Sequence, residues 1–163
     1  MKKYRIGMYG GKFMPFHLGH ALCIDRAAAE CEKVYAILMY NGSEELDILS
    51  KDNSPYLQLE SRFKNLQDYC SQYDNVIPCL MDVLNCRDEN GIEDWDMETP
   101  LVREIVGPEL SAVYSSEPRY DDYFKVAYPE AKHVLVDPPR IIFPISGTKC
   151  RLMNEKERLK WLA

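Results

Sequence analysis

The sequence predicts an α/β fold with a doubly wound, mostly parallel sheet of five or six strands and helices on both faces. Three observations lead to this expectation. Short apolar runs of strand length alternate with segments of helical periodicity, the first run ends at paired glycines directly before a helix, and no linker divides the 163 residues. We therefore expect a single domain that spans residues 1–163.

The first half of the chain contains three expected strands and two expected helices. The strands are short apolar runs, and the second helix repeats apolar residues three or four positions apart. In chain order these are a strand at 4–9, an alanine-rich helix at 18–32, a strand at 34–40, a helix at 56–73 and a strand at 76–81. The acidic stretch 43–47 is expected to be a solvated loop.

The second half begins with a polar, irregular stretch at 82–99, for which we expect a long loop. A helix at 100–106 follows, then strands at 111–115 and 133–137 around a short helix at 120–127, and a helical tail from residue 146. Alternating strands and helices imply parallel pairing through right-handed crossovers, so the sheet should be Rossmann-like. Ligands of such sheets bind beyond the carboxyl ends of the strands.

The composition argues against several classes of function. A formal net charge of −6 is unfavourable for binding nucleic acid, and no apolar run reaches the ~18 residues expected of a membrane span. Six cysteines occur without a Cys-x-x-Cys pair, so we expect reduced thiols in a cytoplasmic protein. The sequence leaves a homo-oligomer open.

The segment GGKFMPFHLGH at residues 10–20 joins the first expected strand to the first helix. Glycines there let a ligand approach the backbone closely. His17 and His20 fall about one turn apart at the helix N-terminus, where free N–H groups and the helix dipole favour anions. Imidazole N–H groups could therefore donate hydrogen bonds to phosphate oxygens. Phe13 and Phe16 are expected to pack their rings in the core.

This segment matches the pattern Gly-x-Phe-x-Pro-x-His-x-Gly-His, and the chain resembles the nucleotidylyltransferase superfamily. It is neither a Walker loop nor a dinucleotide fingerprint. The resemblance implies ATP binding by Gly10, Gly11, Phe13 and Gly19, and catalytic roles for Lys12, His17 and His20. A metal site at His17, His20 and Cys23 is an alternative, although no further ligand at organised spacing is evident.

A second segment, ISGTKCR at residues 145–151, opens the C-terminal helix. Ser146 can cap the helix, while Lys149 and Arg151 supply cationic donors. A capped helix with two exposed cations is the alternative. The segment resembles the superfamily's Ile-Ser-Ser/Gly-Thr-x-x-Arg sequence, which binds the β- and γ-phosphates of ATP in relatives. This implies ATP binding by Ser146, Gly147, Thr148 and Lys149, with Arg151 catalytic.

Three details point to one branch of the superfamily. Gly147 in place of the commoner serine, VDPPR at 136–140 and SSE at 115–117 resemble the adenylyltransferase domain of bifunctional ribosylnicotinamide kinase/NMN adenylyltransferase proteins. The resemblance runs from about residue 5 to 162 and implies that Ser116 also contacts ATP. It makes nicotinamide mononucleotide (NMN) the expected acceptor.

Two residues are expected to bind the acceptor. Trp95 lies in a polar stretch and could stack on a pyridinium ring through a cation–π interaction, or it could only cover the edge of the core. Arg62 is similar to an arginine that relatives place near the acceptor phosphate, and a surface arginine is the alternative. Several other residues receive minor expectations: solvated carboxylates at Asp94 and Asp96, possible ATP contacts at Arg119 and Arg140, and a structural role for His133.

The expected reaction is attack of the NMN phosphate on the α-phosphorus of ATP, which gives NAD and pyrophosphate. Such a phosphate is already largely ionised at neutral pH, so no general base is required. Mg²⁺ is expected to arrive with ATP and to be held by phosphates and water. The alternatives are transfer of AMP or CMP to phosphopantetheine or a phospho-alcohol, and a non-catalytic nucleotide-binding regulatory module.

Overall fold

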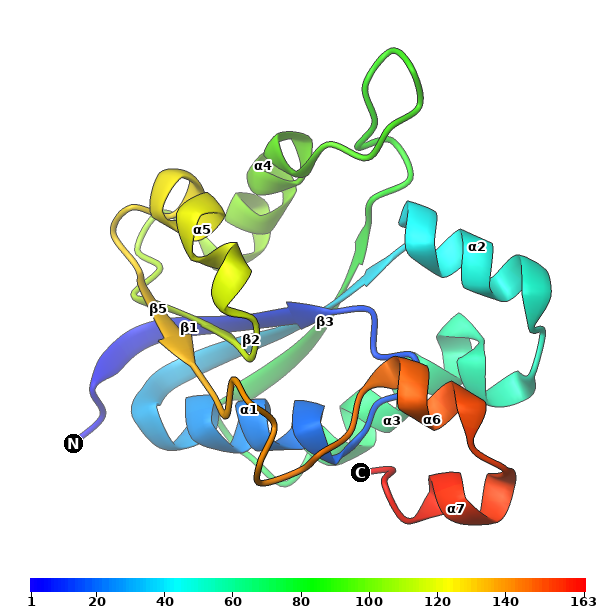
Figure 1. The fold of residues 1–163 in the computed structure, drawn as a ribbon. Coiled ribbons are helices and arrows are strands. Elements are labelled where there is room, and N and C mark those ends of the chain that lie inside the picture. The colour runs from blue at the N-terminus through cyan, green and yellow to red at the C-terminus, as the bar shows by residue number, and fades with distance from the viewer.

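The computed structural model describes residues 1–163 and confirms the predicted α/β class. Five parallel strands form one sheet in the order β3-β2-β1-β4-β5 (Figure 1). The strands are β1 (Tyr4–Gly11), β2 (Cys31–Tyr40), β3 (Val76–Asp82), β4 (Ala112–Ser115) and β5 (Lys132–Leu135). Because the strand order reverses between β1 and β4, their carboxyl ends lie where such sheets bind ligands.

Helices cover both faces of the sheet (Figure 1). The helices are α1 (Leu18–Glu30), α2 (Ser43–Lys51), α3 (Leu59–Cys70), α4 (Trp95–Val106), α5 (Asp121–Ala127), α6 (Gly147–Leu152) and α7 (Glu155–Leu159), and short 3₁₀ turns span Pro55–Leu57 and Pro118–Tyr120. Helices α1 and α3 lie on one face and α4 and α5 on the other, while α2 stands beyond the carboxyl ends of the strands.

Strand β2 shows how the sequence produces two cores. Successive side chains of a strand point to opposite faces. Val34, Ala36 and Leu38 pack in the core under α1 and α3, whereas Ile37 packs in the core under α4. All four side chains are fully buried. A strand covered on both faces needs such a continuous apolar run, which is typical of parallel sheets.

Two expectations about local structure are wrong. The acidic stretch at 43–47 belongs to α2 instead of a solvated loop, and its Glu45 is buried against Arg62. The helix expected at 100–106 begins at Trp95, because the Asp94 side chain accepts a hydrogen bond from the backbone N–H of Asp96 and caps it earlier.

Two further findings concern the chain as a whole. All six cysteines are free thiols, and all but Cys79 are buried. None of the helices has both the length and the apolar character needed to cross a membrane.

Candidate active site

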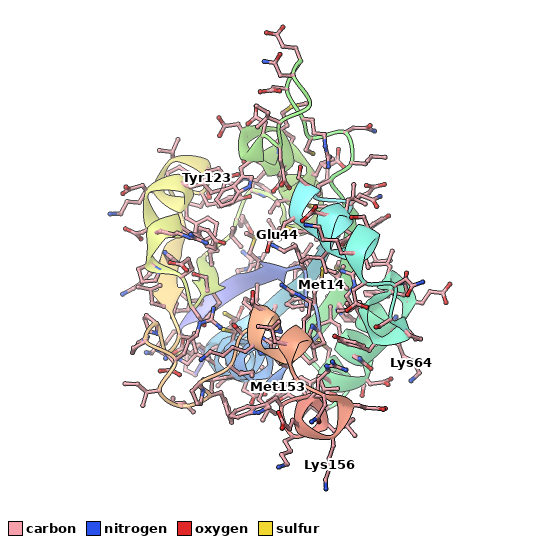
Figure 2. All side chains as sticks on the ribbon, turned by 45° about the vertical axis from the view of Figure 1, so that its right-hand side comes forward. Met14, Glu44, Lys64, Tyr123, Met153 and Lys156 are labelled. Carbon is pink, nitrogen blue, oxygen red and sulfur yellow. The ribbon has the colours of Figure 1, made fainter.

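Two adjoining cavities open at the carboxyl ends of β1 and β4. The first, the polar cavity, has a volume of about 350 Å³. The second, the aromatic cavity, has a volume of about 570 Å³. Seven residues line both: Gly10, Gly11, Lys12, Glu44, Ser115, Arg119 and Tyr120. In Figure 2, Glu44 of α2 and Tyr123 of α5 lie on opposite sides of this opening.

The polar cavity brings the two sequence motifs together. Its lining residues from the predicted site are Gly10, Gly11, Lys12, Phe13, His17, Gly19, His20, Ser116, Ser146, Gly147, Thr148 and Arg151. Lys149 is not among them: its side chain is exposed, and only its backbone N–H joins the site, as donor to Ser146 Oγ at 3.2 Å. The expectation of a second cationic side chain beside Arg151 is therefore not met.

His17 and His20 hold each other in place at the start of α1. The backbone N–H of Gly19 donates to His17 Nδ1 at 3.0 Å, and the backbone N–H of His17 donates to His20 Nδ1 at 3.1 Å. The imidazole rings stack with their centroids 3.6 Å apart. Because both Nδ1 atoms accept, each proton of the neutral rings lies on Nε2. Two N–H donors are thus available to a ligand in the polar cavity.

The surroundings keep both imidazoles neutral. Burial and the positive charge of Arg140 lower the pKa of His17 to about 4. Burial also lowers the pKa of His20 well below its usual value, and His17, Arg140 and Lys12 add to the effect. Desolvation disfavours a charged imidazole, and cationic neighbours act in the same direction. At neutral pH the rings can therefore donate hydrogen bonds without carrying charge.

At two positions of the motifs, neighbouring atoms lie so close to the backbone that only glycine fits. A Cβ at Gly19 would lie 2.9 Å from His17 Cε1, so this glycine makes room for the imidazole of His17. A Cβ at Gly147 would lie 3.0 Å from both Arg151 Nη1 and Met14 O. Arg151 Nη1 donates to Met14 O at 2.8 Å, and Gly147 permits this link between the two motifs.

Cations line the polar cavity, and two of them, Lys12 and Arg119, have carboxylate partners in Glu44 and Glu117. Lys12 Nζ donates to Glu44 Oε2 at 2.9 Å, and this hydrogen bond lowers the pKa of Glu44. Arg140 lines the cavity and donates to Ile145 O at 2.7 Å, and Arg119 lines both cavities. Arg119 and Arg140, expected as possible ATP contacts, thus lie in position for that role. No group of three or more histidine, cysteine or carboxylate side chains could hold a metal ion.

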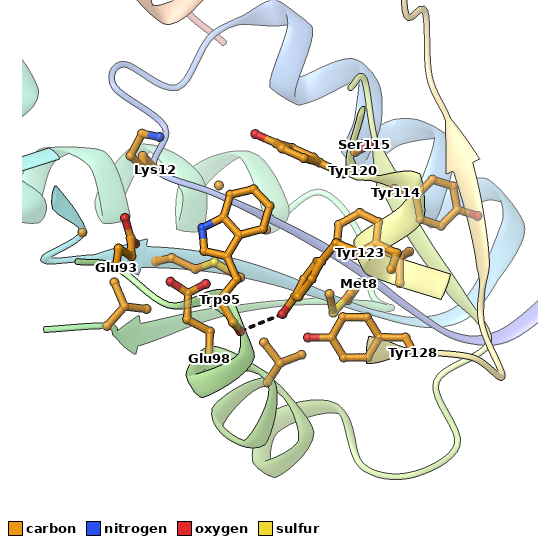
Figure 3. A pocket seen from close by; sticks show the side chains of 18 of the residues that line it. Met8, Lys12, Glu93, Trp95, Glu98, Tyr114, Ser115, Tyr120, Tyr123 and Tyr128 are labelled. Atoms are coloured by element: carbon orange, nitrogen blue, oxygen red, sulfur yellow. Dashed lines mark hydrogen bonds between the residues drawn. The ribbon is translucent and has the colours of Figure 1, made fainter. Parts of the chain in front are cut away.

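Trp95, which is expected from the sequence to bind the acceptor, lines the aromatic cavity. Its ring packs edge-on against Tyr120 and Tyr123, with centroids 5.2 and 5.3 Å apart. The hydroxyl of Tyr123 also donates to the Trp95 carbonyl at 2.7 Å (Figure 3). Trp95 as a whole remains 41% exposed, so part of its surface is left for a ligand. Asp94 and Asp96 do not line this cavity.

Two carboxylates of the aromatic cavity were not expected from the sequence. Glu93 and Glu98 both line it, and Glu98 is buried. Burial, followed by the interaction with Glu93, raises the pKa of Glu98 to about 8. The signal that could have found Glu98 is its position three residues after Trp95, which places both on one face of a helix that begins at Trp95.

Arg62 lines neither cavity. Its side chain is fully buried, where Nη1 donates to Lys12 O at 2.9 Å and to Glu45 Oε2 at 3.0 Å. Its Nε and Nη2 atoms have no hydrogen-bond partner. The predicted contact with the acceptor is therefore wrong. Arg62 instead supports the backbone at Lys12, within the segment 10–20, from the interior of the protein.

His133 has the structural surroundings expected of it. Its Nε2 lies 2.6 Å from Ser115 Oγ and its Nδ1 lies 3.2 Å from Asp121 Oδ1. This chain of contacts ties β5 and α5 to the end of β4, next to both cavities.

Comparisons with known proteins agree with this geometry. A family model described as cytidylyltransferase-like matches residues 8–153. The trifunctional NAD biosynthesis/regulator protein NadR of Salmonella typhimurium is 25% identical over 92% of this chain and 37% of its own length. Phosphopantetheine adenylyltransferase of Mycoplasma mycoides is 27% identical over 77% of this chain and 79% of its own length.

A solved structure shares the fold. The crystal structure of NadR protein in complex with NAD and AMP-PNP superposes with a TM-score of 0.66 at 22% identity, and the match covers 99% of this chain and 46% of that one. This chain spans little more than a third of the length of the curated NadR relative.

Proposed function

We propose that this chain, which belongs to the cytidylyltransferase-like family of nucleotidylyltransferases, transfers AMP from ATP to NMN. The products of this reaction are NAD and pyrophosphate. One observation carries the proposal. The two phosphate motifs line one cavity, and an aromatic cavity containing Trp95 adjoins it across Lys12 and Ser115. ATP would place its phosphates in the polar cavity, and the acceptor ring would enter the aromatic one.

The reaction needs alignment and charge stabilisation more than acid–base chemistry. An oxygen of the NMN phosphate forms a bond to the α-phosphorus of ATP, while the bond from that phosphorus to the α–β bridging oxygen breaks. The electron pair leaves with pyrophosphate. The attacking monoester is already ionised at neutral pH because its second pKa is about 6. Positioning and preorganised donors then account for most of the catalysis.

The histidines supply such donors in this proposal. The Nε2–H groups of His17 and His20 would donate to the oxygens of the reacting phosphate. Because both imidazole rings are neutral, neither has to change its charge as pyrophosphate departs. Lys12 and Arg151 would neutralise the charge that develops on the leaving group. Lys149 is exposed and would contact only the outermost phosphate.

Mg²⁺ would enter as a complex with ATP. In this proposal the metal is held by phosphate oxygens and water. When bound, the ion would neutralise the charge of the leaving pyrophosphate. Chelation by EDTA should therefore stop pyrophosphate release, and excess Mg²⁺ should restore it.

Phosphopantetheine is the second candidate acceptor, because a phosphopantetheine adenylyltransferase is among the similar proteins. Its neutral, flexible chain offers no cation to Trp95 or to the carboxylates of the aromatic cavity. The NMN ring offers both an aromatic plane and a positive charge, and this complementarity favours NMN.

An acceptor panel tests the function. The protein with Mg-ATP would be given NMN, nicotinate mononucleotide, phosphopantetheine or glycerol phosphate, and pyrophosphate release would be measured, with CTP replacing ATP in a parallel series. We expect release with NMN and ATP, with NAD as the second product. His20→Ala is the matched control for contaminating activity. Binding of ATP without release for any acceptor would instead support a nucleotide-binding regulatory module.

A further inference from the structure

The aromatic cavity contains a carboxylate that has no cation. Glu98 is 9% exposed, and no backbone or side-chain N–H donates to its carboxylate. Its cationic neighbour Lys12 is paired with Glu44 at 2.9 Å. A buried carboxylate without a donor is costly, and such groups occur mainly where a ligand or partner completes them.

A second carboxylate increases the negative charge at this point. Glu93, from the loop before α4, lines the same cavity and interacts with Glu98. Figure 3 shows the Glu98 carboxylate directed toward the indole of Trp95, with Glu93 beside it on the side of Lys12. Two neighbouring carboxyl groups are most stable when they share a proton or enclose a cation.

Aromatic side chains make up much of the remaining lining. They are Trp95, Tyr114, Tyr120, Tyr123, Phe124 and Tyr128. Aromatic faces attract cations, and the attraction is strongest where water is excluded. Rings and carboxylates together therefore suit a flat ring that carries a positive charge.

We propose that Glu93 and Glu98 form a carboxylate pair that selects an acceptor whose cationic ring bears a carboxamide over one whose ring bears a carboxylate. This inference rests on the proposed function, since the acceptor cavity and the reaction are the same. The carboxamide N–H₂ of NMN would donate to the pair, and the pyridinium charge would offset its charge. Nicotinate mononucleotide would place a third carboxylate against the pair, which like-charge repulsion disfavours.

The test compares two acceptors in charge-neutral variants. Values of kcat/KM would be measured for NMN and for nicotinate mononucleotide in the wild type, Glu98→Gln and Glu93→Gln. At pH 9, above the pKa of Glu98, we expect the wild type to prefer NMN and the NMN-to-nicotinate ratio to fall at least tenfold in Glu98→Gln, since a hydrogen bond to a charged group contributes at least that factor. The KM for ATP should not change, because neither residue lines the polar cavity.

Asp96→Asn is the matched control. It removes one negative charge from the first turn of the same helix, but Asp96 is exposed and lies outside the cavity. Its acceptor ratio should equal that of the wild type. If Glu98→Gln does not fold, Glu93→Gln carries the comparison, because Glu93 is only partly buried.

A pH profile distinguishes selection by charge from a structural role. Titratable groups near Glu98 come from several elements, and they are Lys12, Cys86, Glu93, Asp94, Tyr123 and Tyr128. A cationic ring favours the ionised form of Glu98, whose pKa is raised to about 8 by burial. The acceptor ratio should therefore rise between pH 6 and 9 in the wild type and stay flat in Glu98→Gln. The phosphate of the acceptor titrates equally in both substrates and cancels in the ratio.

The possible outcomes separate the two proposals. If NMN is adenylylated but the ratio is unchanged in both variants, or if the wild type prefers nicotinate mononucleotide, the carboxylate selection is overturned and adenylyl transfer stands. If neither mononucleotide is a substrate, as with an enzyme specific for phosphopantetheine, the proposed function fails and this inference fails with it. A wild-type preference for NMN that both glutamine variants lose supports both.

Discussion

In the polar cavity the hydrogen-bond donors come chiefly from two short segments, residues 10–20 and 145–151, and hydrogen bonds to the main chain fix their positions. The residues that line the aromatic cavity come instead from several separate stretches between Met8 and Tyr128. The two also differ in charge. The polar cavity holds neutral imidazoles among cations, whereas the aromatic cavity holds two carboxylates, Glu93 and Glu98, that form no ion pair with a lysine or arginine. Main-chain geometry suits a constant group such as phosphate, while side chains from many segments can vary with the acceptor.

The largest expected effect concerns the support of Lys12, a residue that lines both cavities. Arg62→Met should lower the free energy of unfolding by about 3–5 kcal/mol, because it leaves Glu45 as a buried, unpaired carboxylate. Urea denaturation would measure the loss. Since Arg62 supports the Lys12 backbone and touches neither cavity, any folded fraction should keep its KM values for both substrates.

The double variant Arg62→Met/Glu45→Gln provides the control. It removes the unpaired charge and keeps an acceptor for the backbone N–H of Asn41, which now donates to Glu45 at 2.8 Å. Stability should return in large part, especially because two nitrogens of Arg62 lack partners in the native pair. A selective rise in the KM of the acceptor in Arg62→Met would instead restore the role first expected for this arginine.

The second effect is confined to the polar cavity. His20→Ala should lower kcat roughly 100- to 1,000-fold, about 3–4 kcal/mol in the transition state, as removal of one preorganised donor does. The loss should be the same for every acceptor, because His20 lines only the polar cavity. Pyrophosphate release under saturating ATP would measure it.

His20→Gln separates catalysis from helix capping. Glutamine at this position of a helix can accept from the N-cap backbone N–H, as His20 Nδ1 now does. We expect His20→Gln to unfold at nearly the wild-type urea concentration and still to lose most of the turnover. Turnover close to that of the wild type in His20→Ala would remove the imidazole from the mechanism.

These two predictions reflect how unevenly the sequence revealed the site. The clustering of residues 10–20 around one cavity was predictable because the segment is contiguous, and its glycines and histidines are explained by close approach and by helix capping. The second motif was predictable for the same reason, apart from Lys149, because a helix start does not determine where a long side chain points. The positions of the five strands along the chain likewise followed from periodicity, whereas helix α2 was missed because its acidic residues suggested a solvated loop.

The aromatic cavity was less predictable because its residues meet only through tertiary packing. Trp95 could be selected as an aromatic residue in a polar stretch, but the start of α4 was misplaced, so Glu98 was not recognised as its neighbour. Arg62 was misassigned because sequence does not reveal burial. Its partner Glu45 lies in a stretch whose acidity suggested a solvated loop, and only the pair makes burial of either residue tolerable.

The third prediction uses the opposite charges of the two cavities. The pKa of His17 is about 4 in the folded chain against 6.5 when exposed, so between these pH values the folded state binds fewer protons than the unfolded state. Stability from this group is complete above pH 6.5 and is lost as the pH falls toward 4, by on the order of 3 kcal/mol. Glu98 has the opposite sign, because its pKa is raised from 4.5 to about 8 and stability is lost as the pH rises through this range.

Urea unfolding between pH 4 and 9 would measure both limbs. His17→Asn keeps a side chain that can cap Gly19 but removes its titration, so it should make the acid limb shallower and leave the alkaline limb unchanged. His20, whose pKa is also lowered, accounts for the rest of the acid limb. Glu98→Gln should flatten the alkaline limb alone. Equal profiles for the wild type and both variants would show that neither cavity controls stability in this range.

The smallest effect is confined to the aromatic cavity. Trp95→Ala should weaken NMN binding about tenfold, or about 1.4 kcal/mol, through loss of the stacking plane and its cation–π attraction. Trp95→Phe should recover part of this affinity, because a smaller ring still offers a face. Calorimetric titration with NMN would measure the affinity, and the KM for ATP serves as the internal control. If Trp95→Ala weakened ATP as much as NMN, the cavities would not act as separate binding sites, and the division between a constant phosphate site and a variable acceptor site would be wrong for this chain.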